Sequence, residues 1–180
     1  FPENAVHYFV SYYDYYQPES YLPQSDTYIE KETQLNEEID RLRHASTQAL
    51  LSRSDVIIVA SVSCIYGLGN PREYKAMAET LERGQRMKRS TLLHALVHMQ
   101  YARNAVDFHR GTFRVKGEVV EIYPTASDQR IIRLQFFGDE LEKISEHDHL
   151  TGNLIADLDR VDIYPAKHYV TESQRFKEIK

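Results

Sequence analysis

The feature that most constrains the fold is a strand, helix, strand pattern in the first third of the chain. Residues 6–12 are rich in β-branched and aromatic side chains and predict a mostly buried strand. Apolar residues then recur at three- and four-residue spacing from Leu35 to Leu50, which indicates an amphipathic helix. The continuous apolar run in residues 55–61 is typical of a strand buried on both faces of a parallel sheet. Together these elements predict an α/β unit.

The second half of the chain predicts a small α+β domain. Asn70 is a candidate helix N-cap, with Pro71 at the first helical position and Glu73 three residues after the cap, so a helix is expected from there to about Arg83. A second helix is expected from Ser90. Its apolar face comprises Leu92, Leu93, Leu96, Val97 and Met99. Short β segments follow at residues 112–116, 118–123, 130–137, 140–145 and 161–164.

Domain boundaries are expected near Pro71 and near Tyr169, where a terminal helix should begin. Residues 13–32, between the first strand and the long helix, have too few aliphatic side chains to bury themselves. They carry Pro18, Pro23 and Ser/Asp turn chemistry between two aromatic arms, residues 12–16 and 27–29. This composition predicts a long projecting hairpin.

Tyrosines are concentrated in and beside this hairpin: residues 8–28 contain seven of the 13 in the chain. Packing in a core explains about half of them, because the four tyrosines within residues 12–16 must point in both directions from a strand. Exposed rings stack on unpaired bases, at roughly 1–3 kcal/mol per base. Two or three such contacts could offset opening a few base pairs, at about 1.4 kcal/mol per stacked step. Carbohydrate would use the same rings, so the residues alone leave nucleic acid, carbohydrate and packing open.

Charge and composition exclude several classes of protein. Lys and Arg number 22 against 27 Asp and Glu, a net charge of −5, so any contact with nucleic acid must be local. Residues 1–32 hold six acids and one base, and this acidity favours insertion by shape and stacking over phosphate attraction. The longest apolar run is far too short to cross a bilayer of roughly 30 Å. The lone cysteine, Cys64, fits a reducing cytoplasm, and the first residues suggest an excised fragment.

The signatures of enzymes and metal sites are missing. The sequence has no Gly-Lys-Ser/Thr triplet for a phosphate, and in the glycine pair at residues 67–69 Arg72 stands where a dinucleotide motif needs its third glycine. Cys64 has no nearby base and is expected to be a buried structural thiol. Packing or solvation also explains four histidines better than metal binding does: His94, His98, His147 and His149. No catalytic residue, metal site or cofactor is therefore predicted for this chain.

A second notable feature is a set of cations around the later β segments: Arg103, Arg110, Arg114, Lys116, Arg130 and Arg133. A solvated face is the default explanation. Within residues 110–116, however, positions 110, 112, 114 and 116 share one strand face and leave Phe113 and Val115 on the other. This predicts a cationic ridge, which suits carboxylates of a partner protein or phosphates equally well.

Several stretches closely resemble the UvrB family, the damage-verifying subunits of bacterial nucleotide excision repair. They are residues 11–21, 26–31, 59–69, 100–104 and 110–115, and the resemblance covers nearly the whole chain. It implies a partial helicase-like, RecA-type domain over residues 1–72 with a projecting β-hairpin at about 12–35. A UvrA-interaction domain over 73–170 and a return helix or linker over 171–180 would follow.

The resemblance also implies a function. Proteins of this family receive damaged DNA from UvrA, insert the hairpin between the DNA strands, and recruit the nuclease UvrC. The matching DNA-contacting tyrosines are Tyr12, Tyr13, Tyr15, Tyr16, Tyr21 and Tyr28. The matching UvrA-binding residues are Arg103, Arg114, Lys116, Arg133 and Gln135. Lys116 and Gln135 depart from the family pattern, in which Arg and Glu respectively are common, so the docking surface is expected to be retuned at these two positions.

The family's ATPase motifs are absent, so this chain is expected neither to bind nor to hydrolyse ATP, whereas ATP and magnesium are expected in the full-length protein. Membership would also imply a cytoplasmic protein of the SOS response and the UvrABC excinuclease. An alternative is a pure protein-interaction module, since the later half also looks like the UvrA-binding region of the transcription-repair coupling translocase. That translocase lacks a tyrosine-rich hairpin, and the hairpin therefore favours the UvrB family. A carbohydrate-binding surface is a third hypothesis.

Overall fold

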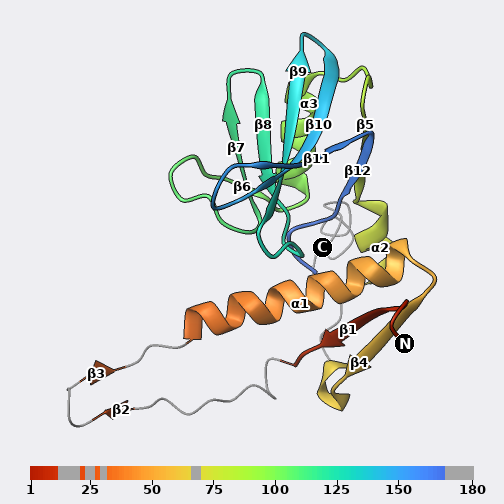
Figure 1. Cartoon of the computed structure of the whole chain (residues 1–180), viewed down its shortest axis with the longest axis vertical. Coiled ribbons are helices and arrows are strands. Elements are labelled where there is room, and N and C mark those ends of the chain that lie inside the picture. Colours follow the sequence, from red (N-terminus) through yellow and green to blue (C-terminus); the bar gives the residue numbers. More distant parts are fainter. Residues whose placement is uncertain (12–20, 23–26, 29–31, 66–69, 169–180) are drawn as a thin grey trace, which may run out of the picture. The chain divides into compact units, whose positions relative to one another are not determined.

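The computed structural model describes residues 1–11, 21–22, 27–28, 32–65 and 70–168 (Figure 1). The chain divides into two compact units, Phe1–Leu68 and Gly69–Lys180. The structure is mixed α/β, which confirms the coarse fold class predicted from the sequence. No helix in the described parts of the chain combines the length and the apolar character needed to span a membrane.

The first unit is built on a parallel strand pair. β1 (Ala5–Phe9) pairs with β4 (Val56–Ala60), and α1 (Glu32–Ser52) lies between them in the sequence and against them in space (Figure 1). The predicted strand, helix, strand unit is therefore confirmed. Arg43 on α1 donates to the carbonyl oxygen of Val10 at 2.9 Å, and its guanidinium lies 4.5 Å from the centre of the Phe9 ring. These contacts fasten the helix to the end of β1.

A short 3₁₀ helix, η1 (Val62–Ile65), follows β4. It carries Cys64, which is buried and whose thiol donates to the carbonyl oxygen of Phe9 at 3.1 Å. The prediction of a buried structural thiol is confirmed.

Burial of the two strands differs from the prediction. Val6 and Val59 are 54% and 55% exposed, and Tyr8 is also largely exposed, so the expectation of a mostly buried first strand and a fully buried second one is wrong. The reason is that, among the described residues, β1 and β4 form a two-stranded sheet in which each has one strand beside it. Apolar side chains fix where a strand forms, but burial depends on the neighbouring strands and layers that cover it.

The described part of the predicted hairpin is a short antiparallel pair. β2 (Tyr21–Leu22) pairs with β3 (Thr27–Tyr28), so that Tyr21 lies opposite Tyr28 and Leu22 opposite Thr27. Tyr12, Tyr13, Tyr15 and Tyr16 lie outside the described residues. α1 begins at Glu32, so the predicted end of the hairpin near Leu35 is already inside the helix.

The second unit contains a six-stranded sheet with the order β11-β10-β9-β8-β7-β6. Its strands are β6 (Ala102–Arg103), β7 (Thr112–Lys116), β8 (Val119–Tyr123), β9 (Arg130–Phe137), β10 (Glu140–Asp148) and β11 (Leu154–Leu158). Only the β6–β7 pair is parallel. The β segments expected at residues 112–116, 118–123, 130–137 and 140–145 are confirmed as β7, β8, β9 and β10, the last of which extends to Asp148. The segment expected at 161–164 is also a strand, at Arg160–Ile163, whereas β6 and β11 were not predicted.

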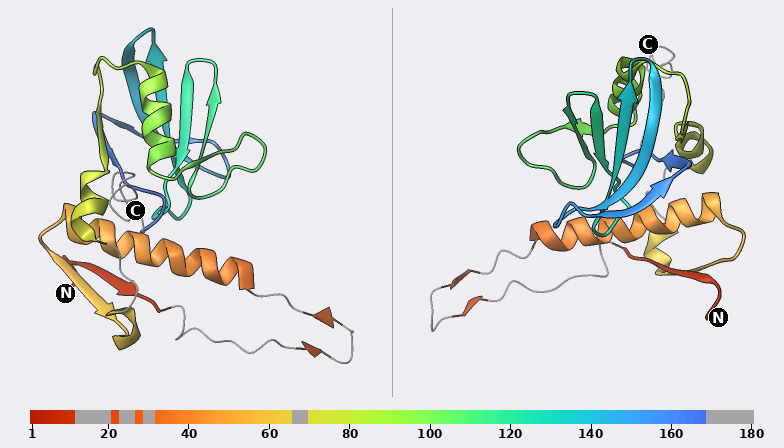
Figure 2. Two further views of the ribbon diagram at one scale, coloured as in Figure 1. Left: turned by 180° about the vertical axis from the view of Figure 1, so that it is seen from behind. Right: turned by 45° about the horizontal axis from the view of Figure 1, so that its top comes forward.

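The helix α3 (Arg89–His98) covers one face of this sheet, as the view from behind shows (Figure 2). Its residues Leu92 and Leu96 are fully buried against inward-facing side chains of the strands. The complete core cluster consists of Leu81, Leu92, Leu96, Met99, Tyr101, Phe113, Val120, Ile122, Ile132, Leu134, Phe136, Leu141, Ile144 and Ile163. The predicted helix and most of its apolar face are confirmed, but Val97 is exposed.

The helix expected from Pro71 to Arg83 is much shorter. Asn70 caps α2 (Pro71–Ala76) as predicted, because its side-chain oxygen accepts from the backbone N–H of Arg72 at 3.0 Å. The chain then forms β5 (Glu79–Glu82), which pairs with β12 (Arg160–Ile163) and buries Leu81 completely. A partner strand 80 residues away in the sequence overrides the local helical pattern. The terminal helix expected from Tyr169 lies outside the described residues.

Candidate functional site

The face of the six-stranded sheet opposite α3 carries polar side chains, because alternate residues of each strand point away from the core. We call this surface the outer face and define it by Arg114, Lys116, Glu121, Arg133 and Gln135. Register places Arg114, Glu121 and Arg133 directly opposite one another on β7, β8 and β9. Four of the five predicted UvrA-binding residues therefore lie on one face of the sheet.

Glu121 lies at the centre of the outer face and is only 3% exposed. Its Oε2 accepts from Nε of Arg114 at 2.5 Å, and its Oε1 accepts from Nε and Nη2 of Arg133 at 2.9 and 2.7 Å. Burial acts to raise the pKa of the Glu121 carboxyl, but hydrogen bonds and charge from Arg133 and Arg114 outweigh it and hold that pKa below its usual value. The carboxylate is therefore ionised at neutral pH and shared by two guanidinium groups.

The Arg114 side chain packs against an aromatic cluster. The guanidinium lies 4.2 Å from the centre of the Phe108 ring, which packs with Tyr123 and Ile131 in a small second core cluster. His149 joins the cluster at 4.5 Å from the Tyr123 ring centre. Burial, and then the charge of Arg114, lower the pKa of His149, while Asp148 opposes the shift. Stacking on Phe108 and pairing with Glu121 together restrict the plane of the Arg114 side chain.

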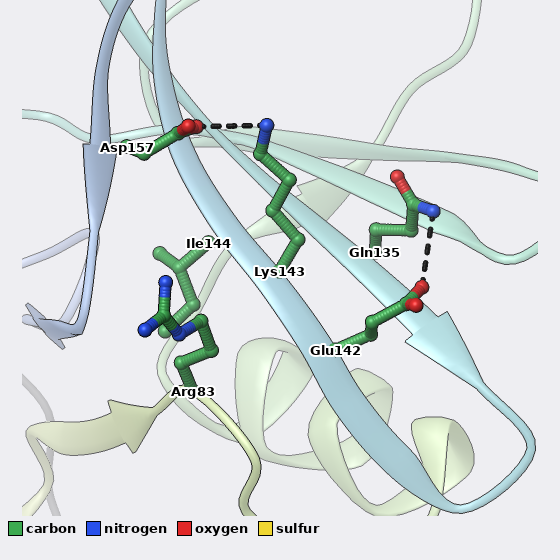
Figure 3. A pocket seen from close by; sticks show the side chains of 6 residues that line it. All are labelled: Arg83, Gln135, Glu142, Lys143, Ile144 and Asp157. Carbon is green, nitrogen blue, oxygen red and sulfur yellow. Dashed lines mark hydrogen bonds and ion pairs between the residues drawn. The ribbon is translucent and has the colours of Figure 1, made fainter.

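Gln135 lies on the outer face, two residues after Arg133 on β9 and beside a shallow pocket of about 360 Å³ (Figure 3). Its amide donates to Glu142 at 3.3 Å, a contact that a glutamate at this position could not make. In the same pocket Lys143 pairs with Asp157 at 2.9 Å (Figure 3). Arg83 also lines the pocket and pairs with Asp159. Cations and acids are balanced here, so the pocket has no strong preference for an anionic ligand.

Arg103 and Lys116 lie at the margins of the predicted docking residues, and both are exposed. Lys116 ends β7 on the outer face, whereas Arg103 is on the edge strand β6, in register with the core residue Phe113. By this register Arg103 belongs to the opposite side of the sheet from Arg114. The five predicted residues thus form a group of four on the outer face and one at the sheet edge.

The predicted cationic ridge over residues 110–116 is only partly correct. Arg110 precedes β7 and donates to the backbone carbonyls of Ser127 and Asp128, while Thr112 is buried and bonded to His109. The strand therefore contributes Arg114 and Lys116 to the outer face, and an acid neutralises the first of these. Alternation located the face correctly, but it could not show which cations are already paired.

The sequence interpretation missed Glu121, which the structure places among the predicted binding residues. A signal was available in principle, because residues 119–123 alternate around an acid in an otherwise apolar strand. A charged residue inside such a strand normally needs a partner. Identifying that partner required the register between β7, β8 and β9, which the sequence alone did not provide.

The structure shows the surroundings of His147, His94 and His98. His147 is buried, with its ring nitrogens near the Ser145 hydroxyl and the Gly152 carbonyl, each at 3.0 Å. His94 and His98 are exposed on α3. Within the described ranges, no cluster of three or more His, Cys, Asp or Glu side chains could hold a metal ion.

Comparison with known proteins identifies the family. Residues 80–169 match the family model described as the UvrB interaction domain. The chain belongs to the UvrB family. UvrABC system protein B of Bacillus subtilis (strain 168) is 57% identical over 178 residues, which is 99% of this chain. The proteins of the same name from Geobacillus kaustophilus (strain HTA426) and Halalkalibacterium halodurans are 58% and 59% identical over 177 residues, or 98% of the chain.

The match covers 27% of each of these relatives, so the chain spans about a quarter of their length. The UvrB interaction domain corresponds to the second unit from β5 onward and includes the whole outer face. Identity over nearly the full chain extends the relationship to the first unit, with β1, α1 and β4.

Proposed function

We propose that this chain acts in UvrABC nucleotide excision repair, where its second unit docks UvrA through the outer face and its hairpin tests DNA for damage. The observation that carries the docking proposal is the row of Arg114, Glu121 and Arg133 across three neighbouring strands. Two guanidinium groups held on one face of a sheet suit carboxylates on a partner protein. Family membership supports UvrA as that partner.

A protein partner fits the outer face better than a nucleic acid does. The row of Arg114, Glu121 and Arg133 has a net charge of only +1, and the whole chain carries −5. Binding to a phosphate backbone gains most from many unpaired cations. Recognition by a partner protein depends more on the placement of a few charged groups, which specify register and orientation.

The hairpin part of the proposal concerns DNA. Tyr21 and Tyr28 lie opposite one another in the β2–β3 pair, and four further tyrosines precede them between residues 12 and 16. Aromatic rings on a narrow hairpin can stack on bases without needing positive charge around them. A helicase-like role for the first unit is part of the same proposal, supported by its parallel β1–β4 pair with a crossover through α1. UvrC would join only in the complete protein.

The two functions are separable by mutation of the intact protein. Replacing Tyr15 and Tyr16 by alanine is expected to weaken complexes with damaged DNA while leaving UvrA binding nearly unchanged. Replacing Lys116, which is exposed on the outer face, by glutamate is expected to reduce UvrA binding at least tenfold and to leave direct binding to bubble DNA unchanged. Lys116 is preferable to Arg114 for charge reversal, because an acid at position 114 would face the buried Glu121.

Arg130→Glu is a matched control for the docking variant. Arg130 is an exposed cation on β9, but alternation places it on the opposite side from Arg133. Undiminished UvrA capture by Lys116→Glu, or an equal loss with Arg130→Glu, would contradict the docking assignment. ATP and magnesium are expected to bind only the complete protein. ATP hydrolysis by the purified 180-residue chain would contradict that expectation.

A further inference from the structure

Glu121 is a buried acid at the centre of a face proposed to bind acidic groups, which is an unexpected place for a negative charge. We infer that Glu121 is a positioning residue of the outer face: its carboxylate holds the guanidinium groups of Arg114 and Arg133 in fixed orientations for carboxylates of UvrA. This inference rests on the proposed docking function. It adds a residue that lies between the binding side chains and is itself too buried to be a main contact.

The geometry of the three side chains supports this role. The Glu121 side chain is 4% exposed, whereas the side chains of Arg114 and Arg133 are 24% and 35% exposed. Each arginine has five N–H donors. Glu121 accepts one from Arg114 and two from Arg133, so both guanidinium groups retain N–H donors at the surface. The carboxylate thus secures the inner edge of each group and leaves outer donors for a partner.

The cost of burying this carboxylate also favours a binding role over a purely structural one. A buried ion pair or triad contributes little net stability, and apolar side chains of similar volume often replace it without loss. The apolar alternative is available at this site, because Tyr123 and Ile131 lie on the same side of the sheet and already form a cluster with Phe108. The burial of a charged carboxylate beside these apolar side chains is explained if Glu121 is needed to orient the guanidinium groups of Arg114 and Arg133.

Orientation matters because free arginine side chains are flexible. Arg114 is restricted on two sides, by the Glu121 carboxylate and by the Phe108 ring at 4.2 Å. Arg133 is restricted by two hydrogen bonds to a single carboxylate oxygen. Ordering these side chains before binding reduces the entropy that association must otherwise overcome. The two arginines are two strands apart, roughly 10 Å between their Cα atoms, a spacing that two separate carboxylates on a partner surface could match.

The substitution Glu121→Gln tests the inference by the sign of its effect. It makes the outer face more positive, so attraction by charge alone would strengthen binding to an acidic partner. Loss of positioning would instead weaken it, because a glutamine amide can accept fewer hydrogen bonds and presents an N–H group to one arginine. We expect about tenfold weaker UvrA binding by the intact protein at physiological salt, mainly through faster dissociation.

Glu118→Gln is the matched control. Glu118 is an exposed acid immediately before β8 and pairs with Arg89 at 3.1 Å, away from Arg114 and Arg133. It makes the same change in charge, and we expect UvrA affinity to stay within about twofold of the unaltered protein or to increase slightly. A weakening confined to Glu121→Gln therefore separates positioning from net charge.

Coupling between residues provides a readout that a general structural defect would not give. In a protein that already carries Arg114→Ala and Arg133→Ala, Glu121→Gln is expected to have no further effect on UvrA binding. The Nε–H signals of Arg114 and Arg133 in an NMR spectrum of the unaltered protein should be sharp and protected, and should broaden in Glu121→Gln. If Glu121→Gln fails to fold, Arg133→Lys keeps the charge but loses the planar donor pair and is expected to weaken binding similarly.

The outcomes distinguish the inference from the proposal beneath it. Unchanged or tighter UvrA binding by folded Glu121→Gln would overturn the positioning role, even if the arginine variants bind weakly. Unchanged binding by the Arg114→Ala, Arg133→Ala protein would instead overturn the docking function itself. A loss of binding in Glu121→Gln that persists undiminished without the two arginines would also contradict positioning, because it would act through some other group.

Discussion

The two units of the molecule differ in how completely their strands are covered. In the second unit, fourteen residues from a helix, a six-stranded sheet and the β5–β12 pair form one continuous core. Among the described residues of the first unit, β1 and β4 pair only with each other, and apolar residues such as Val6 and Val59 are more than half exposed. Both units have strongly β-forming segments, but β7, β8 and β9 of the second unit are much better buried than β1 and β4 of the first.

This difference teaches that strand formation and strand burial are separate properties. Parallel sheets in proteins are usually covered on both faces, and a two-stranded sheet is marginal by itself. Antiparallel strands such as β7, β8 and β9 are joined by short turns, so each strand pairs with the strand that follows it in the sequence. The second unit therefore carries nearly all the information for its own core, whereas the first depends on contacts that its described residues do not supply.

The largest expected effect comes from separating the units. A protein comprising residues 70–168 should fold alone, with a single cooperative thermal transition, because its core is internal to that range. Residues 1–68 alone should not keep a protected β1–β4 pair. Circular dichroism and amide hydrogen exchange would measure both. A non-cooperative transition for residues 70–168, or strong protection in isolated residues 1–68, would contradict the comparison.

Two alanine substitutions test the same contrast at single residues. Leu134→Ala removes a fully buried side chain at the centre of β9 and should reduce the free energy of unfolding by about 3 kcal/mol. Val59→Ala, at a position 55% exposed on β4, should cost below about 0.5 kcal/mol. Urea denaturation monitored in each unit would give both values. Equal costs at the two positions would show that Val59 is buried in solution.

The limits of prediction from this sequence follow the same division. Residues 112–116 and 130–137 were predicted as strands with their observed bounds, because alternation and short turns specify antiparallel strands locally. The segment 79–82 was assigned to a helix, because its partner β12 lies 80 residues further on. Local patterns cannot show a pairing at that distance.

The sequence predicted residues of the candidate site that share one face of the sheet, but not the electrostatics of that face. Arg114 and Arg133 were identified through a family resemblance, and alternation correctly predicted that Arg114 and Lys116 share a face. The sequence did not reveal that Glu121 joins the two arginines, since this depends on register across three strands. The roles of the hairpin tyrosines, four of which lie outside the described residues, stay predictions.

A smaller effect is expected at Tyr74, which lies near the start of the second unit and contacts residues 164–168. Tyr74 on α2 stacks with Tyr164 and with His168, at 6.0 and 5.7 Å between ring centres, and its hydroxyl donates to the carbonyl oxygen of Pro165 at 3.2 Å. Tyr74→Phe keeps the stacking but removes this hydrogen bond, so it should lower the free energy of unfolding by about 1 kcal/mol. Tyr74→Ala should cost clearly more, because the ring is buried.

Thermal denaturation of residues 70–168 and of the whole chain would check this pair. If the segments around Tyr74 and Pro165 belong to the fold of the second unit, both variants should lose the same stability in the two proteins. A loss seen only in the whole chain would mean that the ring stack depends on residues 1–68, and the second unit would then be less self-contained than its core suggests.

The smallest expected effect is a dependence of the second unit's stability on pH. The pKa of His149 is lowered by burial and by Arg114, so the unfolded chain takes up a proton at higher pH than the folded one. The contribution of His149 to the free energy of unfolding is therefore fully present above the usual pKa of histidine, about 6.5. It is lost as pH decreases from there toward the folded-state pKa. The lowered pKa of Glu121 acts in a more acidic range: its stabilisation is lost as pH falls through its folded-state pKa.

The two groups can be distinguished by their pH ranges. His149→Gln should flatten the decline between about pH 7 and pH 5, and Glu121→Gln should flatten the decline below about pH 4.5. Melting temperatures of residues 70–168 across this range would measure both, with His94→Gln as a control, since His94 is exposed on α3. If His149→Gln leaves the curve unchanged, the imidazole must be accessible to solvent in the folded state. The aromatic cluster would then not be packed tightly enough to support Arg114.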